Sequence, residues 1–333
     1  MISVSSFAKI NLGLKIGPAR PDGFHELRTV YQTLALHDVI RVDVVEGEGI
    51  EVRCDDLRVP LDSSNTCYKI AERVMGASAA GRPTAGLAKI IIEIEKHLPV
   101  QGGMGAASSN AVATMLAMER ALGLRLSPQD KMRIAAEVGS DLPLFLIGGT
   151  VLGVGRGEEV FPLPDLPTLP VVVITPAVGV STPRAFARWD ELAARDAALT
   201  GSSMAGTINQ FSQSVFVWLG TGFPQVRPAS GVPARGGDRA ETPLLDLVRA
   251  GIENDFEKVV FPEYPDLREV KGLLLREGAS YASLSGSGST LYGLFASEVQ
   301  AQAAAERMTA AGHNAVATTT VTREEYWKAV ASG

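Results

Sequence analysis

The strongest chemical signal in the chain is a glycine-rich run between a predicted strand and a predicted helix. The run reads Leu98-Pro99-Val100-Gln101-Gly102-Gly103-Met104-Gly105-Ala106-Ala107-Ser108-Ser109-Asn110. Its glycines let the backbone curl and approach a ligand closely, and its two serines favour the start of a helix. Backbone N–H groups and the positive end of the helix dipole would then converge beside the loop, which suits a phosphate. Glycine turns also precede helices that bind nothing, and the Gly-Lys-[Ser/Thr] of a Walker A motif is missing.

Two charged residues in the same half of the chain could act on a bound triphosphate. Asp141 stands at a predicted helix start just before an apolar stretch, and Lys9 lies on a predicted strand. Phosphoryl transfer to an alcohol needs a carboxylate that accepts or orients the hydroxyl proton, a lysine that stabilises charge, and magnesium on the phosphates. Taken singly, the aspartate also suits an ordinary helix cap, and the lysine also suits a solvated strand face.

Two further segments could contact a nucleotide. Phe24 and His25, in a predicted loop over residues 23–27, offer a flat apolar ring beside a hydrogen-bonding ring, a combination that suits a planar base. A core or surface pair is the alternative interpretation. The turn Ser285-Gly286-Ser287-Gly288-Ser289 is typical of a hairpin, but its glycines could instead let a second backbone segment approach the phosphate.

Hydrophobic patterning predicts the elements that position these residues. Residues 2–16 alternate between apolar and polar types, which predicts a half-buried strand with Lys9 and Asn11 together on its polar face. Ser127 followed by proline predicts a helix start. The other predicted strands cover residues 39–45, 50–54, 90–95, 171–175, 281–284, 290–295 and 315–320. The other predicted helices cover residues 65–75, 107–122, part of 207–218, 266–277 and 299–311, with a long loop at 220–242.

The prolines between residues 162 and 170 predict a stiff, extended connector and hence a domain boundary. We therefore expect an ATP-binding catalytic domain over residues 1–162 and a substrate-binding domain over residues 163–333. Helices packed on one face of a mostly antiparallel sheet would give each half an α+β architecture.

Composition narrows the class of protein. A chain of 333 residues that is 46% hydrophobic can bury a large core, and a net charge of −6 argues against a nucleic-acid partner. Two cysteines and four histidines show neither a disulfide framework nor a zinc spacing. The uncharged apolar stretch over residues 142–155 is shorter than the roughly 20 residues of a membrane span. With no secretory pattern at the amino terminus, we expect a cytoplasmic protein without a membrane partner.

Three ordered segments, Phe7–Leu12, Pro99–Asn110 and Leu284–Ser289, resemble the motifs of the GHMP kinases, the superfamily of galactokinase and of the homoserine, mevalonate and phosphomevalonate kinases. Within it, four features resemble the branch that acts on a cytidine-diphosphate-linked methylerythritol. They are Ala8–Leu12, Asp22–Leu27, Gly139–Pro143 and Gly155–Glu158. The resemblance covers nearly the whole chain. It implies an amino-terminal domain like the second domain of ribosomal protein S5 and a ferredoxin-like carboxy-terminal domain.

The resemblance also implies a reaction and a role for each matching residue. ATP, with magnesium, would phosphorylate the 2-hydroxyl of the cytidine compound in the non-mevalonate route to isoprenoids. Lys9 and Asp141 match the catalytic pair, and Asn11 lies beside the substrate diol. The implied ATP contacts are Asn65, Pro99, Gly102, Gly103, Met104, Gly105, Ala106, Ala107, Ser108 and Ser109. The implied substrate contacts are Phe24, where tyrosine is usual, His25, Arg156 and Phe186.

Two alternatives stay open at this point. The first is a GHMP kinase for another small alcohol, such as homoserine or mevalonate, although Phe24 and His25 argue against substrates that carry no base. The second is a nucleotide-binding protein that has lost its chemistry, although the presence of both Lys9 and Asp141 argues against that. The sequence identifies no magnesium ligand and does not decide between a monomer and a homodimer.

Overall fold

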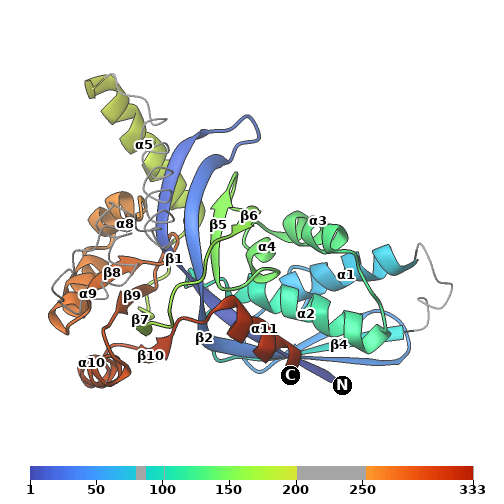
Figure 1. Ribbon diagram of the computed structural model, residues 1–333. Helices are drawn as coiled ribbons and strands as arrows, with labels where there is room; N and C mark the ends of the chain where they lie inside the picture. The colour runs from blue at the N-terminus through green and yellow to red at the C-terminus, as the bar shows by residue number, and fades with distance from the viewer. Residues whose placement is uncertain (80–87, 101, 201–252, 333) are drawn as a thin grey trace, which may run out of the picture.

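The structure, a computed structural model, describes residues 1–79, 88–100, 102–200 and 253–332. Two sheets make up the fold, and the long central strands in Figure 1, β1 and β2, belong to the first of them. The helix predicted within residues 207–218 and the loop predicted over residues 220–242 lie outside the described residues.

The first sheet is built on two long strands. β1 (Ile2–Ala19) and β2 (His25–Glu46) pair antiparallel along nearly their whole length. β4 (Ala88–Glu95) joins the second half of β2, and β5 (Thr150–Val154) joins the first half. The edges are β3 (Ile50–Cys54), parallel to β4, and β6 (Glu159–Pro162), antiparallel to β5. β2 begins at His25, so the loop predicted over residues 23–27 is wrong from that residue on.

β1 differs from its prediction in a way that matters for the site. Its register against β2 shifts between Phe7 and Lys9 and again between Asn11 and Gly13. Such bulges re-aim side chains and are common beside active sites. Both faces of the strand are covered, and Lys9 is only 3% exposed. The predicted half-buried strand is therefore wrong, because other parts of the chain pack over its polar face.

Four helices lie beside the first sheet, on the right in Figure 1. They are α1 (Thr66–Ala79), α2 (Ala106–Leu122), α3 (Pro128–Val138) and α4 (Leu142–Phe145). Ser127 caps α3 as predicted, accepting a hydrogen bond from the backbone N–H of Asp130. The predicted serine start of α2 is wrong: α2 begins after Gly105, whose positive φ of 71° makes the turn without a side-chain cap.

The second sheet has the order β10-β7-β9-β8, with every pair antiparallel. Its strands are β7 (Pro170–Ile174), β8 (Tyr281–Leu284), β9 (Leu291–Leu294) and β10 (Ala315–Thr319). The helices beside it are α5 (Thr182–Thr200), α8 (Glu257–Glu263), α9 (Pro265–Arg276) and α10 (Glu298–Ala310). The predicted α+β architecture is confirmed, whereas α5, α8, β5, β6 and the helix at Arg323–Ser332 have no counterpart among the predicted elements.

Apolar packing joins the two sheets. One cluster of buried residues lies under the first sheet, a second under the second sheet, and a third between them, where Ile10 and Leu12 of β1 meet Tyr292 of β9. The last helix, α11 (Arg323–Ser332), returns to the first sheet, where Tyr326 and Val330 enter its core. The first sheet ends at Pro162 and the second begins at Pro170, and the functional division at residue 162 stays a prediction.

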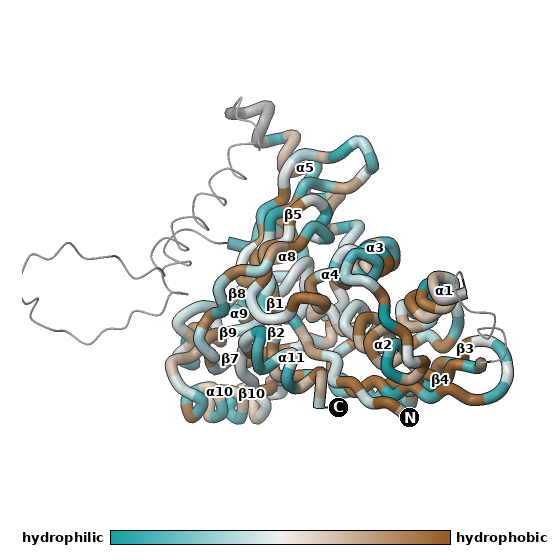
Figure 2. The backbone as a smooth tube through the Cα atoms, turned by 45° about the vertical axis from the view of Figure 1, so that its right-hand side comes forward, coloured by the Kyte–Doolittle hydropathy of each residue, from teal (hydrophilic) through white to brown (hydrophobic). Residues whose placement is uncertain are grey.

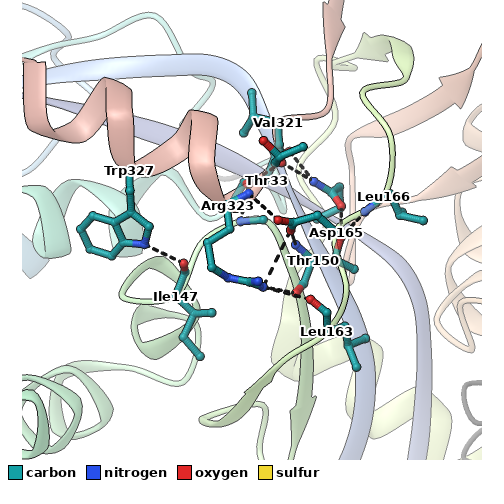
Figure 3. A network of polar contacts seen from close by, with 12 residues as sticks. Thr33, Ile147, Thr150, Leu163, Asp165, Leu166, Val321, Arg323 and Trp327 are labelled. Atoms are coloured by element: carbon teal, nitrogen blue, oxygen red, sulfur yellow. Dashed lines mark hydrogen bonds and ion pairs between the residues drawn. The ribbon is translucent and has the colours of Figure 1, made fainter. Parts of the chain in front are cut away.

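Figure 3 shows how the chain fastens α11 to the first sheet. The guanidinium of Arg323 donates to the carbonyl oxygens of Thr150 and Leu163, at 2.9 and 3.2 Å, and its backbone N–H donates to Asp165. In Figure 2, α3 is coloured as largely hydrophilic. In the described ranges, no helix is both long and apolar enough to cross a membrane.

Candidate active site

Lys9 and Asp141 come together in the folded chain, although 132 positions separate them in the sequence. Lys9 Nζ lies 3.4 Å from Asp141 Oδ2, and the Tyr31 hydroxyl donates to Asp141 Oδ1 at 3.2 Å. Lys9 Nζ also lies 5.5 Å from the centre of the Tyr31 ring. Burial, and then the charge of Asp141, raises the pKa of Tyr31 well above 10, so this hydroxyl keeps its proton and acts as a donor. Asp141, by contrast, is one-third exposed, so a substrate can reach it.

Asn11 extends this group along β1. Its Oδ1 accepts a hydrogen bond from Lys9 Nζ at 2.7 Å, and its Nδ2 donates to Thr29 Oγ1 at 2.8 Å. Thr29 in turn donates to the carbonyl oxygen of Gly13. Lys9 and Asn11 stand between the two bulges of β1, and their fixed partners leave each side chain little freedom. The lysine is therefore preorganised for a role beside Asp141.

The glycine-rich run forms one wall of a cavity of about 290 Å³. Every residue proposed for ATP except Ser109 lines it, and so do three residues with no predicted role, Arg58, Cys67 and Lys96. The backbone N–H of Lys9 donates to the carbonyl oxygen of Met104 at 2.9 Å, so the run is tied directly to the strand that carries the lysine. The cavity and the Lys9–Asp141 pair therefore share one loop.

The second glycine segment packs against the first. The backbone N–H of Thr290 donates to the carbonyl oxygen of Gly102 at 3.1 Å, and the hydroxyl of Ser285 donates to that of Gly103 at 3.0 Å. A Cβ built on Gly286 would lie 3.6 Å from Lys9 Nζ. Residues 285–289 therefore approach the loop and the lysine, as the functional interpretation of that turn requires. The amide of Asn254 holds this turn by donating to the carbonyl oxygens of Leu284 and Gly286.

The buried carboxylate of Asp38 fixes the segments on both sides of the glycine-rich loop. Asp38 has no exposed surface, and it accepts hydrogen bonds from Lys96 Nζ, from the backbone N–H groups of His97 and Leu98, and from the Asn110 amide, at 2.5 to 3.0 Å. These donors come from the end of β4 and from α2, the two elements that flank the glycine run. Charge-assisted hydrogen bonds of this kind are among the stronger ones in proteins, so Asp38 sets the distance that the loop must span.

Two residues proposed for ATP have side chains with local partners. Asn65 lines the cavity, but its Oδ1 accepts from the backbone N–H of Cys67, at the start of α1, and its Nδ2 donates to the carbonyl oxygen of Pro60. The hydroxyl of Ser109 accepts a hydrogen bond from Ser6 of β1 at 2.8 Å. Both side chains therefore stabilise the walls of the cavity.

The residues proposed for the cytidine substrate form two stacked pairs. His25 stacks on Phe186 of α5, with ring centres 4.9 Å apart and planes 9° apart, and His25 Nε2 lies 2.7 Å from Asp190 Oδ1. Phe24 is half exposed and carries the guanidinium of Arg156 over its ring at 4.9 Å. Phe24 and His25 were singled out from their residue types, whereas Arg156 and Phe186 came forward only through the family resemblance. The structure pairs each ring with a second group.

Tyr31, Asp38 and Asp190 are the main residues that sequence reasoning missed. Tyr31 and Asp38 lie within or beside apolar strand residues of β2, where only pairing with β1 and β4 brings them to the site. Asp190 lies on a helix that was not predicted. Among the residues that the structure describes, no three His, Cys, Asp or Glu side chains gather closely enough to hold a metal ion.

Comparison with known proteins gives the class of this fold and site. Residues 65–149 match the GHMP kinases N terminal domain, and residues 241–314 match the GHMP kinases C terminal family. A crystal structure of mevalonate kinase from L. major, in complex with R-mevalonate, has the same fold, with a TM-score of 0.67 and 16% identity over 97% of this chain and 96% of that chain. The fold and the two matches define a GHMP kinase.

More similar relatives show to which family of GHMP kinases the chain belongs. A 4-diphosphocytidyl-2-C-methyl-D-erythritol kinase of Solibacter usitatus is 36% identical over 87% of this chain and 80% of its own length. One of Moorella thermoacetica is 32% identical over 92% of this chain and 95% of its own length. A crystal structure of 4-(cytidine 5'-diphospho)-2C-methyl-D-erythritol kinase superposes with a TM-score of 0.69 at 28% identity, covering 96% of this chain and 99% of that one. The chain belongs to the 4-diphosphocytidyl-2-C-methyl-D-erythritol kinase family, and the family resemblance is confirmed.

Proposed function

We propose that this chain transfers the γ-phosphoryl group of ATP to the 2-hydroxyl of 4-diphosphocytidyl-2-C-methyl-D-erythritol, a step of the non-mevalonate route to isoprenoid precursors. The observation that carries the proposal is the juxtaposition of Lys9 and Asp141, 3.4 Å apart, beside a glycine loop that lines a cavity of about 290 Å³. Family membership supports the choice of substrate.

The chemistry follows from the positions of these groups. The substrate hydroxyl gives its proton to the Asp141 carboxylate as its oxygen attacks the γ-phosphorus, and ADP leaves. Lys9, held by Asn11 at 2.7 Å, stabilises the negative charge on the transferring oxygens. The glycine loop supplies backbone N–H groups to the triphosphate. Tyr31 holds one oxygen of Asp141, so that the carboxylate keeps its orientation while the proton moves.

Magnesium suits this site as part of the substrate MgATP. The described residues offer no cluster of carboxylates, and the Asp141 oxygens already face Lys9 and Tyr31. Magnesium in kinases is bound largely by phosphate oxygens and water, with few protein ligands. When bound, the ion would neutralise phosphate charge, and Ser108, which lines the cavity, is the residue of the run whose hydroxyl would help to hold it.

The substrate site draws on both halves of the chain. Asn11, Phe24, His25 and Arg156 lie before residue 162, whereas Phe186 lies on α5 after it. We propose that the cytosine ring binds among Phe24, His25 and Phe186, with Arg156 near the diphosphate. Residues 1–162 would then carry ATP and the catalytic groups, and residues 163–333 would complete the substrate site. A cytoplasmic location and a monomeric or homodimeric state are further predictions.

A coupled assay of ADP release tests the function. The purified chain is supplied with ATP, magnesium and one of three alcohols: 4-diphosphocytidyl-2-C-methyl-D-erythritol, homoserine or mevalonate. We expect turnover with the cytidine compound alone. Turnover with one of the others instead would keep the reaction class and refute the substrate. If no ADP is released with any of the three alcohols although ATP binding is measurable, the result would favour a nucleotide-binding protein without kinase activity.

Replacing His25 tests the base pocket. His25→Ala removes a stacked ring and a hydrogen-bonding group, which together contribute about 1–3 kcal/mol of binding, so we expect the KM for the cytidine substrate to rise roughly 10- to 100-fold. The KM for ATP should change much less, because His25 lies outside the cavity that the glycine loop lines. His313→Ala, after α10, is the matched control. Equal changes in both KM values would mean that the base binds elsewhere.

A further inference from the structure

The helix that begins with Asp141 is too short to hold its own orientation. α4 has four residues, and Asp141, its N-cap, makes no side-chain cap hydrogen bond. Isolated helices of this length are unstable, because few backbone bonds offset the ordering of the chain. The last carbonyl groups of a helix also have no partner within it. The position of Asp141 therefore depends on what α4 contacts.

The carboxyl end of α4 is held by α11. The Tyr326 hydroxyl donates to the carbonyl oxygen of Phe145 at 2.6 Å, and the Trp327 indole N–H donates to that of Ile147 at 2.9 Å (Figure 3 shows the second bond). Tyr326 is buried, and its ring lies against Gly148, where a Cβ would overlap it. Two consecutive side chains of α11 thus occupy one face of this turn.

α4 lies between these contacts with α11 and the reacting groups. Its first residue follows Asp141, and its last residue, Phe145, points toward the glycine loop: a Cβ on Gly105 would lie 3.0 Å from Phe145 Cζ and 3.0 Å from Lys9 Cγ. Phe145 and Lys9 thus both lie beside Gly105, so the short helix meets the loop at its carboxyl end, and Asp141 stands at its amino end. A tilt of α4 would change the 3.4 Å separation of Lys9 and Asp141.

α11 is itself fixed at its beginning. Arg323 binds the carbonyl oxygens of Thr150 and Leu163, and Val321 donates its backbone N–H to the carbonyl oxygen of Thr33 on β2 at 3.0 Å. Thr33 is paired with Lys9 in the β1–β2 register. The segment around α11 therefore contacts both β2, next to the lysine, and α4, next to the aspartate.

From these contacts we infer that Tyr326 and Trp327 are positioning residues, which set the place of Asp141 through α4. The inference rests on the proposed kinase function. Neither residue lines the cavity proposed for ATP or belongs to the proposed substrate contacts, so their replacement should lower kcat and leave both KM values nearly unchanged. A misplacement of about 1 Å can lower the rate by roughly 100-fold, and the loss of one hydrogen bond should give a smaller change.

The experiment compares Tyr326→Phe and Trp327→Phe with Ser332→Ala, which removes a hydrogen bond that stays inside α11. We expect kcat to fall roughly 3- to 30-fold in the first two and to stay unchanged in the control. Adding Tyr326→Phe to Asp141→Asn should have little further effect, because both changes act through one carboxylate. An equal loss of kcat in both backgrounds, or unchanged kcat in both single variants, would overturn the inference.

Hydrogen exchange separates this inference from the proposed function. Amide exchange over residues 139–149 should rise in Tyr326→Phe and not in Ser332→Ala, whether or not any alcohol is phosphorylated. If the unmodified chain turns over no alcohol, the proposed function fails, whatever exchange shows. If it is active and exchange over this segment is unchanged in both Tyr326→Phe and Trp327→Phe, the positioning role fails. Trp327→Phe, which leaves the buried tyrosine in place, covers the case in which Tyr326→Phe does not fold.

Discussion

Asp141→Asn should lower kcat by roughly 10²- to 10⁴-fold, the usual contribution of a positioned general base. The amide keeps the size of the carboxylate and an oxygen that can accept from Tyr31, but it cannot take the hydroxyl proton at neutral pH. The KM for ATP should hold, because the cavity that the glycine loop lines does not include residue 141. Steady-state turnover and equilibrium ATP binding, measured on the same preparation, check both halves of the prediction.

A suitable control is Asp43→Asn. It makes the same chemical change on β2, where Asp43 pairs with the amino terminus at 3.3 Å and takes no part in the site. Equal turnover in the unmodified chain and in Asp141→Asn would remove Asp141 from the mechanism. A loss of ATP binding together with activity would instead mean that the change disturbs the loop through Lys9.

Gly103→Ala should abolish most ATP binding. Gly103 has a φ of +81°, and a Cβ at this position would overlap the carbonyl oxygen of Ser285. Positive φ alone strains an L residue by about 1–3 kcal/mol, and here the two glycine segments would also have to separate. We expect the KM for ATP to rise more than about 10-fold, the equivalent of 1.4 kcal/mol, and the midpoint of thermal unfolding to fall. Isothermal titration with ATP and calorimetric unfolding measure the two effects.

Gly49→Ala is the control that separates the effect of backbone strain from the effect of the steric overlap at Gly103. Gly49 also has a positive φ, +95°, but a Cβ there would meet nothing within 4 Å. This variant should therefore lose stability by the strain alone and keep its affinity for ATP. If both variants bound ATP as tightly as the unmodified chain, the close approach of residues 285–289 to the loop would have no bearing on the nucleotide site.

Local pattern was enough to predict most elements of the second half of the chain. α9, β8, α10 and β10 each begin and end within two residues of their predicted bounds, because each has its own capping or turn residues and a regular apolar face. β1 was predicted as a strand but not as a buried one, since its polar side chains meet residues far along the chain: Lys9 lies beside Asp141 and Lys15 beside Asp255. α8 was missed because Pro262 lies inside it, which local rules interpret as a break.

The residues of the site also fall into two groups: those that local sequence predicts, and those that only the folded chain brings together. The glycine loop is local, so its sequence predicts both its shape and its ligand class, and the cavity contains nearly all of its residues. Tyr31 and Asp38 could not be found by pattern, since a tyrosine and an aspartate on a strand have many uses and only the pairing of β2 with its neighbours brings them to Asp141 and to the loop. Residue types suggested Phe24 and His25 for a base, and the family resemblance added Arg156 and Phe186, but neither predicted the pairing of His25 with Asp190.

The course of β1 through all three apolar clusters has a consequence for how the protein acquires its structure. Val4 and Phe7 belong to the first cluster, Ile10 and Leu12 to the one between the sheets, and Leu14 and Ile16 to the second. The first cluster also needs Tyr326, so its contacts span more than 300 positions of the sequence. Such non-local contacts slow folding. Neither half can complete its interior alone, and melting should therefore be a single cooperative transition rather than two successive ones.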